Sequence, residues 1–405
     1  MPIVLNKKAN PMIKNNPKIP AGWSVKRLDE IGIFMSGTGF PEKEQGGIEG
    51  LPFYKVSDMN LSENSIYMIK SNNYVTESQI KQMHIRPILQ KSILFAKVGA
   101  AIFLERKRIA ENFLCDNNMM CFSPFGFSLF YKYYFDILRL SKYAQVGALP
   151  SYNASDLANI KILLPPLAEQ EKIAEILGAW DSAIEKLTAL IAAKRLQKKG
   201  MMQKLLTARI RLPGFTGEWQ KVKLGDFLKF QTGFPFDSQF FNQDSAGIRL
   251  VKNRDLKSDD QVYFYSGKYA DTDIVENGDI LVGMDGDFLP CLWKKGTALL
   301  NQRVGKIVCK KTLNHTFAYY ILFSPLEKIQ NETASTTVKH LSHSGVEKIK
   351  TTIPIDISEQ KAIADILSKA DEEIDLLTRK LDLIQSQKKG LMQQLLTGKI
   401  RVKVV

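Results

Sequence analysis

The chain has 405 residues, of which 44% are hydrophobic and 24% charged, a composition typical of globular rather than disordered proteins. Its 56 Lys and Arg residues outnumber its 42 Asp and Glu residues, which leaves a formal net charge of +14. Such an excess favours a polyanionic partner, either nucleic acid or an anionic membrane surface. No stretch approaches the ~18 uninterrupted apolar residues of a transmembrane helix, so we expect no membrane-spanning segment.

The first twenty residues carry four lysines and four prolines and lack the apolar core of a signal peptide. They predict a flexible basic arm over residues 1–20 and a cytoplasmic protein. The four cysteines stand singly, without a C-x₂-C pair, so the sequence predicts neither a zinc site nor a disulfide framework. His340 and His343 form one close histidine pair, but no third ligand lies nearby in the sequence, and we expect no metal site.

A long internal repeat determines the predicted organisation of the chain. Residues 169–211 align with residues 359–401 without a gap at a constant shift of 190, and both copies contain EQ, KKG and LLT. Looser matches precede each copy, such as SILFAKVG at 92–99 with DILVGMDG at 279–286. The chain is therefore expected to run globular unit, long helix, globular unit, long helix.

Each globular unit combines short β-rich runs with turn residues and one amphipathic helix, near residues 128–140 in the first and 317–322 in the second. The expected fold class is α+β, with two mixed α/β domains that alternate with two long helices. The predicted boundaries are residues 21–164 and 213–353 for the globular domains, and 165–212 and 354–405 for the helical regions.

Both repeated helices carry apolar residues at steps that alternate between four and three, the heptad seam of a coiled coil. Each helix is predicted at about 30 residues, or on the order of 45 Å. Packing of each helix on its own domain is one explanation of the seam. Antiparallel pairing of the two helices, with a globule at each end and approximate two-fold symmetry, is the explanation we favour. The seam consists of Ile173, Leu177, Trp180, Ile184, Leu187 and Ile191 in the first helix, and of Ile363, Leu367, Ala370, Ile374, Leu377, Leu381 and Ile384 in the second.

Two similar globules at the ends of a rigid spacer suit a periodic ligand. DNA repeats about every 10 base pairs, roughly 34 Å, and proteins with two-fold symmetry use that spacing to reach two half-sites. Because the globules differ in their loops, the predicted DNA site is asymmetric, with two different half-sequences separated by a gap that is not read.

The same residues carry a family resemblance that extends from Trp23 to Arg401. Two variable domains, each followed by a helix that opens with proline and EQ and closes with KKG-x-MQ-x-LLT, resemble the specificity subunit of type I restriction–modification enzymes. The openings read PPLAEQ from Pro165 and PIDISEQ from Pro354, so the second copy has one extra residue before EQ.

The resemblance implies that each globule is a target-recognition domain for one half of a bipartite site in double-stranded DNA. It implies that the paired helices set the gap and bind two methyltransferase subunits, which bring S-adenosylmethionine, and that motor-nuclease subunits add ATP- and Mg-dependent cleavage. The chain itself would hold no cofactor and carry out no catalysis.

The sequence offers little support for an enzyme. It contains neither the N/D-P-P-Y/F run of adenine methyltransferases nor a phosphate-binding G-x-x-x-x-G-K-[ST] loop. Two alternatives remain open: a stand-alone DNA methyltransferase or nuclease, and a coiled-coil scaffold that binds only proteins. Asp279, Asp285 and Asp287 lack the spacing of a calcium loop and are expected to lie in a solvated loop.

Candidate DNA contacts are Lys, Arg and small polar residues in loops that correspond between the repeats. Any one of them could equally be a solvated surface residue, and Gln302 and Asn117 could instead be interior hydrogen-bonding residues. The repeated lysines of the KKG motifs could face phosphate, a partner subunit or water. The candidates are Lys55, Ser57, Lys97, Lys107, Ser151, Tyr152 and Asn153 in the first domain, and Lys252, Asn253, Arg254, Arg303, Thr336, Lys339 and His340 in the second.

One prediction concerns the spacer. Insertion or deletion of a helical turn in either long helix, for instance between Glu175 and Lys194, should change the length of the unread gap and leave the half-sequences intact. A selection of preferred DNA sites from a random pool measures both properties. Altered half-sequences at an unchanged gap would contradict the prediction.

Overall fold

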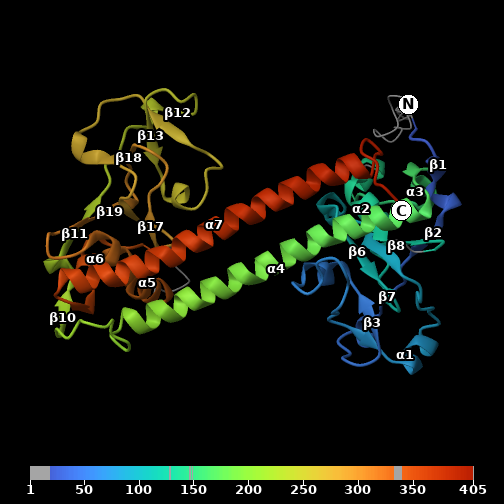
Figure 1. Ribbon diagram of the computed structural model, residues 1–405, viewed down its shortest axis with the longest axis horizontal. Coiled ribbons are helices and arrows are strands. Elements are labelled where there is room, and N and C mark those ends of the chain that lie inside the picture. The colour runs from blue at the N-terminus through green and yellow to red at the C-terminus, as the bar shows by residue number, and fades with distance from the viewer. Residues whose placement is uncertain (1–18, 127–128, 146, 148, 333–339, 405) are drawn as a thin grey trace. The chain divides into compact units, whose positions relative to one another are not determined.

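The computed structural model, drawn in Figure 1, describes residues 19–126, 129–145, 147, 149–332 and 340–404. Two compact units divide the chain: unit 1 comprises residues 1–187 and 380–405, and unit 2 comprises residues 188–379. Both boundaries fall inside long helices, so each unit contains one globular domain and a segment of both helices. Most of the predicted basic arm, and the candidates Thr336 and Lys339, lie outside the described residues.

The domain of unit 1 is built on three sheets. A four-stranded antiparallel sheet has the order β2-β8-β5-β6, a three-stranded sheet has the order β4-β3-β7, and β1 pairs with β9. The apolar β5 is buried at every residue, as expected for a central strand. The strands are β1 (Ser24–Arg27), β2 (Gly32–Ser36), β3 (Leu51–Tyr54), β4 (Tyr74–Val75), β5 (Ser92–Ala96), β6 (Lys107–Ala110), β7 (Leu114–Cys115), β8 (Met119–Pro124) and β9 (Lys161–Leu164).

The domain of unit 2 repeats this plan. Its four-stranded sheet has the order β11-β19-β16-β17, its second sheet has the order β12-β14-β13-β18-β15, and β10 pairs with β20. The strands are β10 (Trp219–Lys223), β11 (Leu228–Thr232), β12 (Phe241–Asn242), β13 (Ile248–Val251), β14 (Tyr263–Tyr265), β15 (Ile274–Val275), β16 (Ile280–Gly283), β17 (Pro290–Leu292), β18 (Ala298–Leu300), β19 (Val304–Cys309) and β20 (Lys350–Pro354).

One helix in each domain covers the four-stranded sheet, near the two predicted positions. In unit 1, α2 buries six consecutive residues, and five of them, including Phe130 and Phe135, belong to the core that also contains Phe122 of β8. In unit 2, α5 buries Phe317 and Leu322 in the corresponding core. The shorter helices and these two are α1 (Glu77–Gln82), α2 (Leu129–Ile137), α3 (Ala154–Ala158), α5 (His315–Glu332) and α6 (His343–Glu347).

The two long helices are α4 (Leu167–Leu205) and α7 (Ile357–Leu395), each of 39 residues. The predicted length of about 30 residues was therefore too short. Both helices continue through the glycine of their KKG motif, Gly200 and Gly390, because a single glycine costs an exposed helix only about 1 kcal/mol. At 1.5 Å per residue, each helix is about 58 Å long.

The heptad residues divide into two groups. Ile173 and Leu177 in unit 1, and Ile363 and Leu367 in unit 2, belong to the hydrophobic core of their own domain. The first two seam positions of each helix are thus explained by packing on the domain that precedes them. The later seam positions are buried or half-buried at the same spacing: Trp180, Ile184, Leu187 and Ile191 in α4, and Ala370, Ile374, Leu377, Leu381 and Ile384 in α7.

Ion pairs join segments of α4 and α7 inside each unit. In unit 1, the Nζ atom of Lys388 lies 2.5 Å from Oδ1 of Asp181. In unit 2, the Nζ atom of Lys198 lies 2.5 Å from Oδ1 of Asp371. These lysines belong to the two KKG motifs, and their ammonium groups face carboxylates on the other long helix.

Each of these aspartates also accepts a hydrogen bond from the domain. The hydroxyl of Tyr133 on α2 donates to Asp181, and the hydroxyl of Tyr320 on α5 donates to Asp371, both at 2.7 Å. Burial, together with the neighbouring aspartate, raises the pKa of both tyrosines, so that the hydroxyls stay protonated as donors. The same lysine–aspartate–tyrosine arrangement thus ties the two long helices to the domain in each unit.

A buried glutamate stands at the start of each long helix. In unit 1, Glu169 accepts hydrogen bonds from Nε and Nη2 of Arg401 at 2.7 and 2.8 Å, and from Nε1 of Trp23 at 2.9 Å. The carboxylate therefore connects the residue that precedes β1, the start of α4 and the segment that follows α7. A bidentate arginine–carboxylate pair of this kind fixes both distance and orientation.

The same connection occurs in unit 2. There Glu359 accepts from Nε and Nη2 of Arg211 at 2.7 and 2.9 Å, and from Nε1 of Trp219 at 3.2 Å. The three repeated sequence features, Trp at the domain start, EQ at the helix start and I-R after the helix, are thereby explained by one contact.

Replacement of this glutamate should destabilise its unit. Glu169→Ala leaves the indole N–H of Trp23 and the guanidinium of Arg401 without their shared acceptor, which should cost about 2 kcal/mol. Thermal unfolding should then begin about 5 °C lower. Glu171→Ala is the matched control, because Glu171 is exposed two residues along the same helix. An equal effect of the two substitutions would contradict the prediction.

Candidate nucleic-acid interface

Three loops meet at one edge of the four-stranded sheet in unit 1. After β5, the backbone N–H of Lys97 donates to the carbonyl of Asn118 at 2.7 Å, and the carbonyl of Lys97 accepts from the N–H of Tyr152 at 3.1 Å. Val98 forms a β-bridge with Ser151. We call residues 97–99, 117–118 and 151–153 the loop cluster of unit 1.

The same three loops meet in unit 2. The N–H of Met284 donates to the carbonyl of Arg303 at 2.9 Å, and the carbonyl of Met284 accepts from the N–H of Leu341 at 2.7 Å. Asp285 forms a β-bridge with His340. Residues 284–286, 302–303 and 340–342 are the loop cluster of unit 2, and the structure thus brings the predicted residues Arg303 and His340 together.

Polar side chains in the loop cluster of unit 2 contact one another at the surface. Nδ1 of His340 lies 2.8 Å from Oδ1 of Asp285, and Nη1 of Arg303 lies 3.7 Å from the same oxygen. Asn253 donates from Nδ2 to the carbonyl of Asp285 at 2.6 Å. Gly283 is required beside it, because a Cβ there would lie 2.1 Å from Oδ1 of Asn253. Asp285 therefore contacts three residues that were predicted to bind DNA, namely Asn253, Arg303 and His340.

A second cationic segment follows β13 in unit 2. The Nζ atom of Lys252 lies 3.3 Å from the ring centroid of Tyr263, and Nη1 of Arg254 donates to Gln261 at 2.8 Å. Partial burial, followed by the nearby charge of Arg254, lowers the pKa of Lys252. The carboxylate of Asp255, which is fully buried, accepts the backbone N–H of Lys252 at 2.8 Å and holds the turn in place.

The matching segment of unit 1 has the same internal support. Asp58, also fully buried, accepts the backbone N–H of Lys55 at 2.7 Å. Nζ of Lys55 donates to Gln45 at 2.9 Å, and Ser57 is exposed. Asn153 is exposed and Ser151 half-buried in the loop cluster. Lys55, Ser57, Lys97, Ser151 and Asn153 thus remain candidates for contact with a ligand.

Two predicted contacts are removed by burial. Only 1% of Lys107 is exposed, and its ammonium binds Glu105 and the carbonyl of Leu138 beneath the surface. Burial lowers the pKa of this lysine. Tyr152 is 2% exposed and packs in the domain core against Phe95. Neither side chain has surface to offer a ligand, so both leave the set of candidate DNA contacts.

The surrounding positions also differ from expectation. Asn117 and Gln302 are exposed turn residues rather than interior hydrogen-bonding residues. Asn118, which sequence reasoning did not select, occupies the position in unit 1 that Arg303 occupies in unit 2. Alignment of the DNNM and NQRV turns, at 116–119 and 301–304, would have revealed this correspondence.

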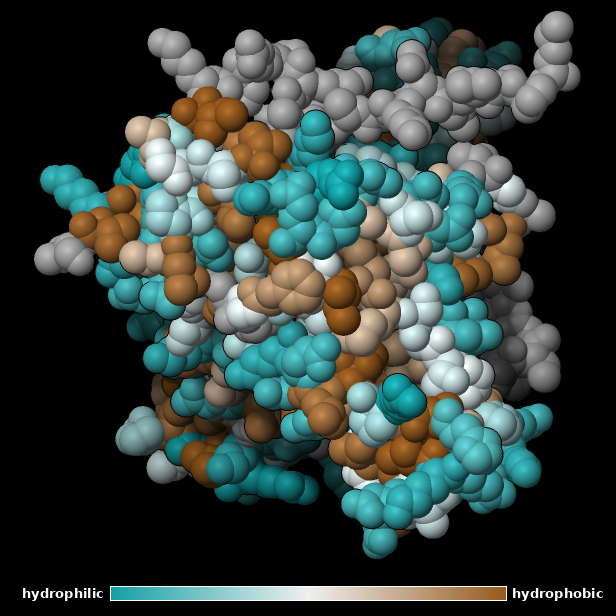
Figure 2. All heavy atoms as spheres, turned by 90° about the vertical axis from the view of Figure 1, so that its right-hand side faces the viewer, coloured by the Kyte–Doolittle hydropathy of each residue, from teal (hydrophilic) through white to brown (hydrophobic). Residues whose placement is uncertain are grey.

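Hydrophobic and hydrophilic residues are mixed on the face of the molecule that Figure 2 shows. Figure 2 shows hydrophobic residues that reach one face in separate groups among hydrophilic ones. Large apolar side chains are exposed in unit 1 at Ile48, Ile69 and Phe103, among others. Scattered exposure of this kind is ordinary for a folded protein and does not by itself mark a binding site.

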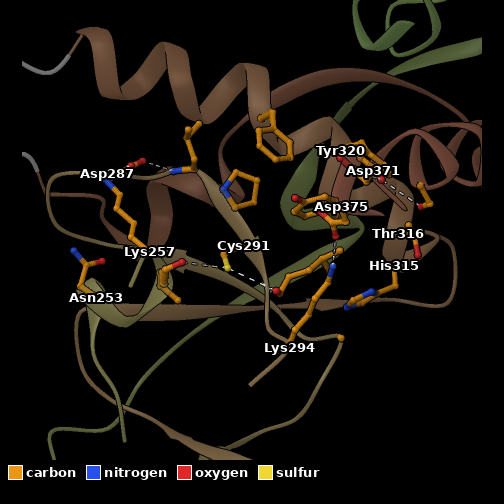
Figure 3. A pocket seen from close by; sticks show the side chains of 18 of the residues that line it. Asn253, Lys257, Asp287, Cys291, Lys294, His315, Thr316, Tyr320, Asp371 and Asp375 are labelled. Carbon is orange, nitrogen blue, oxygen red and sulfur yellow. Dashed lines mark hydrogen bonds and ion pairs between the residues drawn. The ribbon is translucent and has the colours of Figure 1, made fainter. Parts of the chain in front are cut away.

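Unit 2 also contains a cavity of about 1170 Å³ between its domain and α7, shown in Figure 3. Charged groups on its wall pair with each other: Lys257 lies 2.6 Å from Asp287, and Lys294 lies 3.3 Å from Asp375. Burial raises the pKa of Cys291, so its thiol stays protonated and is not an activated nucleophile. The cavity wall therefore does not present the features of a catalytic cysteine site.

The structure describes residues 19–126, 129–145, 147, 149–332 and 340–404. Within that part of the chain, no group of three or more His, Cys, Asp or Glu side chains is arranged to hold a metal ion. The helices in the same residues do not combine the length and hydrophobicity that a bilayer crossing requires.

Comparison with known proteins identifies the family. Residues 20–195 and 216–386 both match the type I restriction modification DNA specificity domain, and the chain belongs to this family. The resemblance inferred from the repeated EQ and KKG-x-MQ-x-LLT motifs is confirmed.

Individual relatives agree with this assignment. The chain is 29% identical to the type I restriction enzyme MjaVIII specificity subunit of Methanocaldococcus jannaschii, over 63% of this chain and 65% of the relative. It is 33% identical to the type I restriction enzyme EcoBI specificity subunit of Escherichia coli, over 45% of this chain and 38% of the relative. The crystal structure of a type I restriction-modification S subunit from M. genitalium has the same fold, with a TM-score of 0.59 at 15% identity, over 96% of this chain and 99% of that one.

The turn that carries Lys252, Asn253 and Arg254 depends on an ion-pair network that acid should weaken. Oδ1 of Asp259 lies 2.6 Å from Nη2 of Arg249 and 2.7 Å from Nζ of Lys295, which also donates to the carbonyl of Asp255 at 2.6 Å. Hydrogen bonds from these two cations lower the pKa of Asp259 to about 2.

Because the folded state lowers this pKa, Asp259 stabilises the fold above its unfolded value of about 3.9 and loses that contribution as the pH falls towards 2. We expect Asp259→Asn to lower stability at pH 7 by about 1 kcal/mol or less, since the group is half exposed. The difference should shrink between pH 4 and pH 2.5 in urea unfolding. Asp244→Asn, at an exposed loop position, is the control; a deficit that stays constant with pH would contradict the assignment.

Proposed function

We propose that this chain is the DNA-specificity subunit of a type I restriction–modification complex and that it carries out no catalysis itself. Each domain reads one half of an asymmetric bipartite site in double-stranded DNA. One observation carries the proposal: the same backbone frame presents different exposed side chains in the two loop clusters. Val98, Asn118 and Ser151 stand in unit 1 where Asp285, Arg303 and His340 stand in unit 2. Two readers of common descent with different contact residues are what an asymmetric site requires.

The long helices act as the spacer. We place α4 and α7 side by side as an antiparallel coiled coil that sets the gap and gives the molecule approximate two-fold symmetry. The later heptad positions support this, because they are buried or half-buried at alternate steps. The ion pairs Lys388–Asp181 and Lys198–Asp371 support it as well, since each pairs the end of one helix with the first half of the other.

The same helices would bind two methyltransferase subunits. Away from the seam, large apolar side chains remain exposed, with Leu190 at 42%, Leu376 at 60% and Leu383 at 57%. Exposed leucines on a helix face are suited to contact with another protein. In this proposal S-adenosylmethionine belongs to the methyltransferase subunits, and ATP and Mg²⁺ to the motor-nuclease subunits of the full complex.

The rival functions have less support. A stand-alone methyltransferase or nuclease would need a catalytic site, and the one cavity described above has a protonated thiol and mutually paired charges. A protein-only scaffold would not need a net charge of +14 or the exposed Arg303 and His340 in one loop cluster.

Methylation mapping tests the proposal. Methyltransferase subunits of the same system, expressed in a host that lacks them, should methylate one bipartite adenine-containing motif only when this chain is present. The purified chain alone, mixed with labelled S-adenosylmethionine and DNA, should transfer no methyl group.

Transfer by the chain alone would favour the stand-alone enzyme. An unchanged methylation pattern with and without the chain, together with the absence of salt-dependent, sequence-selective DNA binding, would favour the scaffold.

A further inference from the structure

The turns at 116–119 and 301–304 are the same structural element in the two domains. Gly37 donates to the carbonyl of Met119 as Gly233 donates to that of Val304, and both hydrogen bonds are 3.0 Å or shorter. The carbonyls of Asn118 and Arg303 accept matching bonds from the central loops at 2.7 and 2.9 Å. The third position of the turn is therefore Asn118 in unit 1 and Arg303 in unit 2.

The backbone at Arg303 is unusual for its residue type. Its φ of 73° lies in the left-handed region, which costs a residue with a Cβ some free energy and favours glycine or asparagine. Asn118 has no positive φ, although asparagine would tolerate one better. A position that would be easier for glycine is therefore occupied by a long cationic side chain, and the side chain must supply the reason.

The guanidinium of Arg303 is oriented from one side. Its Nη1 atom lies 3.7 Å from Oδ1 of Asp285 and 3.4 Å from Nδ1 of His340. Among the residues that the structure describes, Nε and Nη2 of Arg303 donate no hydrogen bond. Its side chain is 57% exposed. The edge of the guanidinium formed by Nε and Nη2 carries two parallel N–H groups. It is thus available to a ligand with two neighbouring acceptors.

The carboxylate of Asp285, beside Arg303, favours contact of the guanidinium with a base over contact with a phosphate. A phosphate at the arginine would come close to the negative charge of Asp285, whereas the edge of a base is neutral. Guanine presents two neighbouring acceptors in the major groove, O6 and N7, at the spacing of the arginine fork.

We propose that Arg303 reads one guanine in the half-site of the second domain, with Asp285 and His340 as the residues that orient it. This inference rests on the proposed function. The corresponding Asn118 offers an amide, which complements adenine rather than guanine, so the same turn requires a different base in each half-site.

The experiment maps adenine methylation in cells that express the methyltransferase subunits with wild-type chain, Arg303→Asn or Arg303→Gly. Both substitutions suit a positive φ and should not lower the thermal unfolding temperature. One guanine in one half-site should become degenerate, with preference for it falling about ten- to a hundredfold, while the other half-site and the gap stay unchanged. Lys311→Ala removes an exposed cation in the turn after β19, outside the loop cluster, and should leave the motif intact.

Three outcomes would overturn the inference. They are an unchanged motif, a uniform loss of methylation at all sites without loss of sequence preference, and a wild-type motif without a G·C pair. The second outcome would mean that Arg303 contacts phosphate. Failure of the proposed function looks different, because wild-type chain would then direct no methylation at all.

Discussion

The rest of the structure depends on one carboxylate in each unit, Glu169 in unit 1 and Glu359 in unit 2. Each is buried at the start of a long helix and accepts three hydrogen bonds, two from an arginine and one from a tryptophan. A buried carboxylate without partners would cost several kcal/mol, so all three chain segments that meet there must be present for the unit to be stable. This constraint ties the start of each domain to its own long helix and to the end of the other.

A second layer of contacts repeats farther along the helices. The first lysine of each KKG motif pairs with an aspartate on the other helix, and that aspartate also accepts a hydrogen bond from a tyrosine of the domain. Each unit is thus held by residues from distant parts of the sequence. In the loop clusters Tyr152, Met284 and Leu341 pack into the domain cores, whereas Asn118 and Arg303 have exposed side chains and contribute backbone hydrogen bonds. The exposed positions can therefore carry different side chains in the two domains.

The sequence predicted the two long helices well, because their residues are the ones that the internal repeat preserves. The alignment of 169–211 with 359–401 predicted both long helices, and the heptad spacing predicted which residues turn inward. The predicted helix length of about 30 residues was too short, because both helices continue through KKG, where Lys198 and Lys388 pair with aspartates of the other helix.

The candidate contacts were less predictable, since exposure depends on packing between distant segments. Lys107 follows a loop and resembles a surface cation in sequence, but the carboxylate of Glu105 and the carbonyl of Leu138 bind its ammonium below the surface. Tyr152 lies between the accessible Ser151 and Asn153, yet its ring packs inward. The role of Asp285 was likewise hidden, because the bridge that brings His340 to it spans 55 residues.

The positive charges of the chain also fall into two groups, those paired inside the fold and those exposed on loops. Many of the basic residues are neutralised within the fold, as Arg211 and Arg401 are by buried glutamates and Lys198 and Lys388 by aspartates. The cations that remain exposed at the loop edge include Arg254 and Arg303, which are held by partial contacts that leave donors available. A polyanion would therefore be attracted to the molecule by its net charge but recognised through a few oriented side chains, and replacement of those side chains would alter recognition without disturbing the buried pairs that hold each unit together.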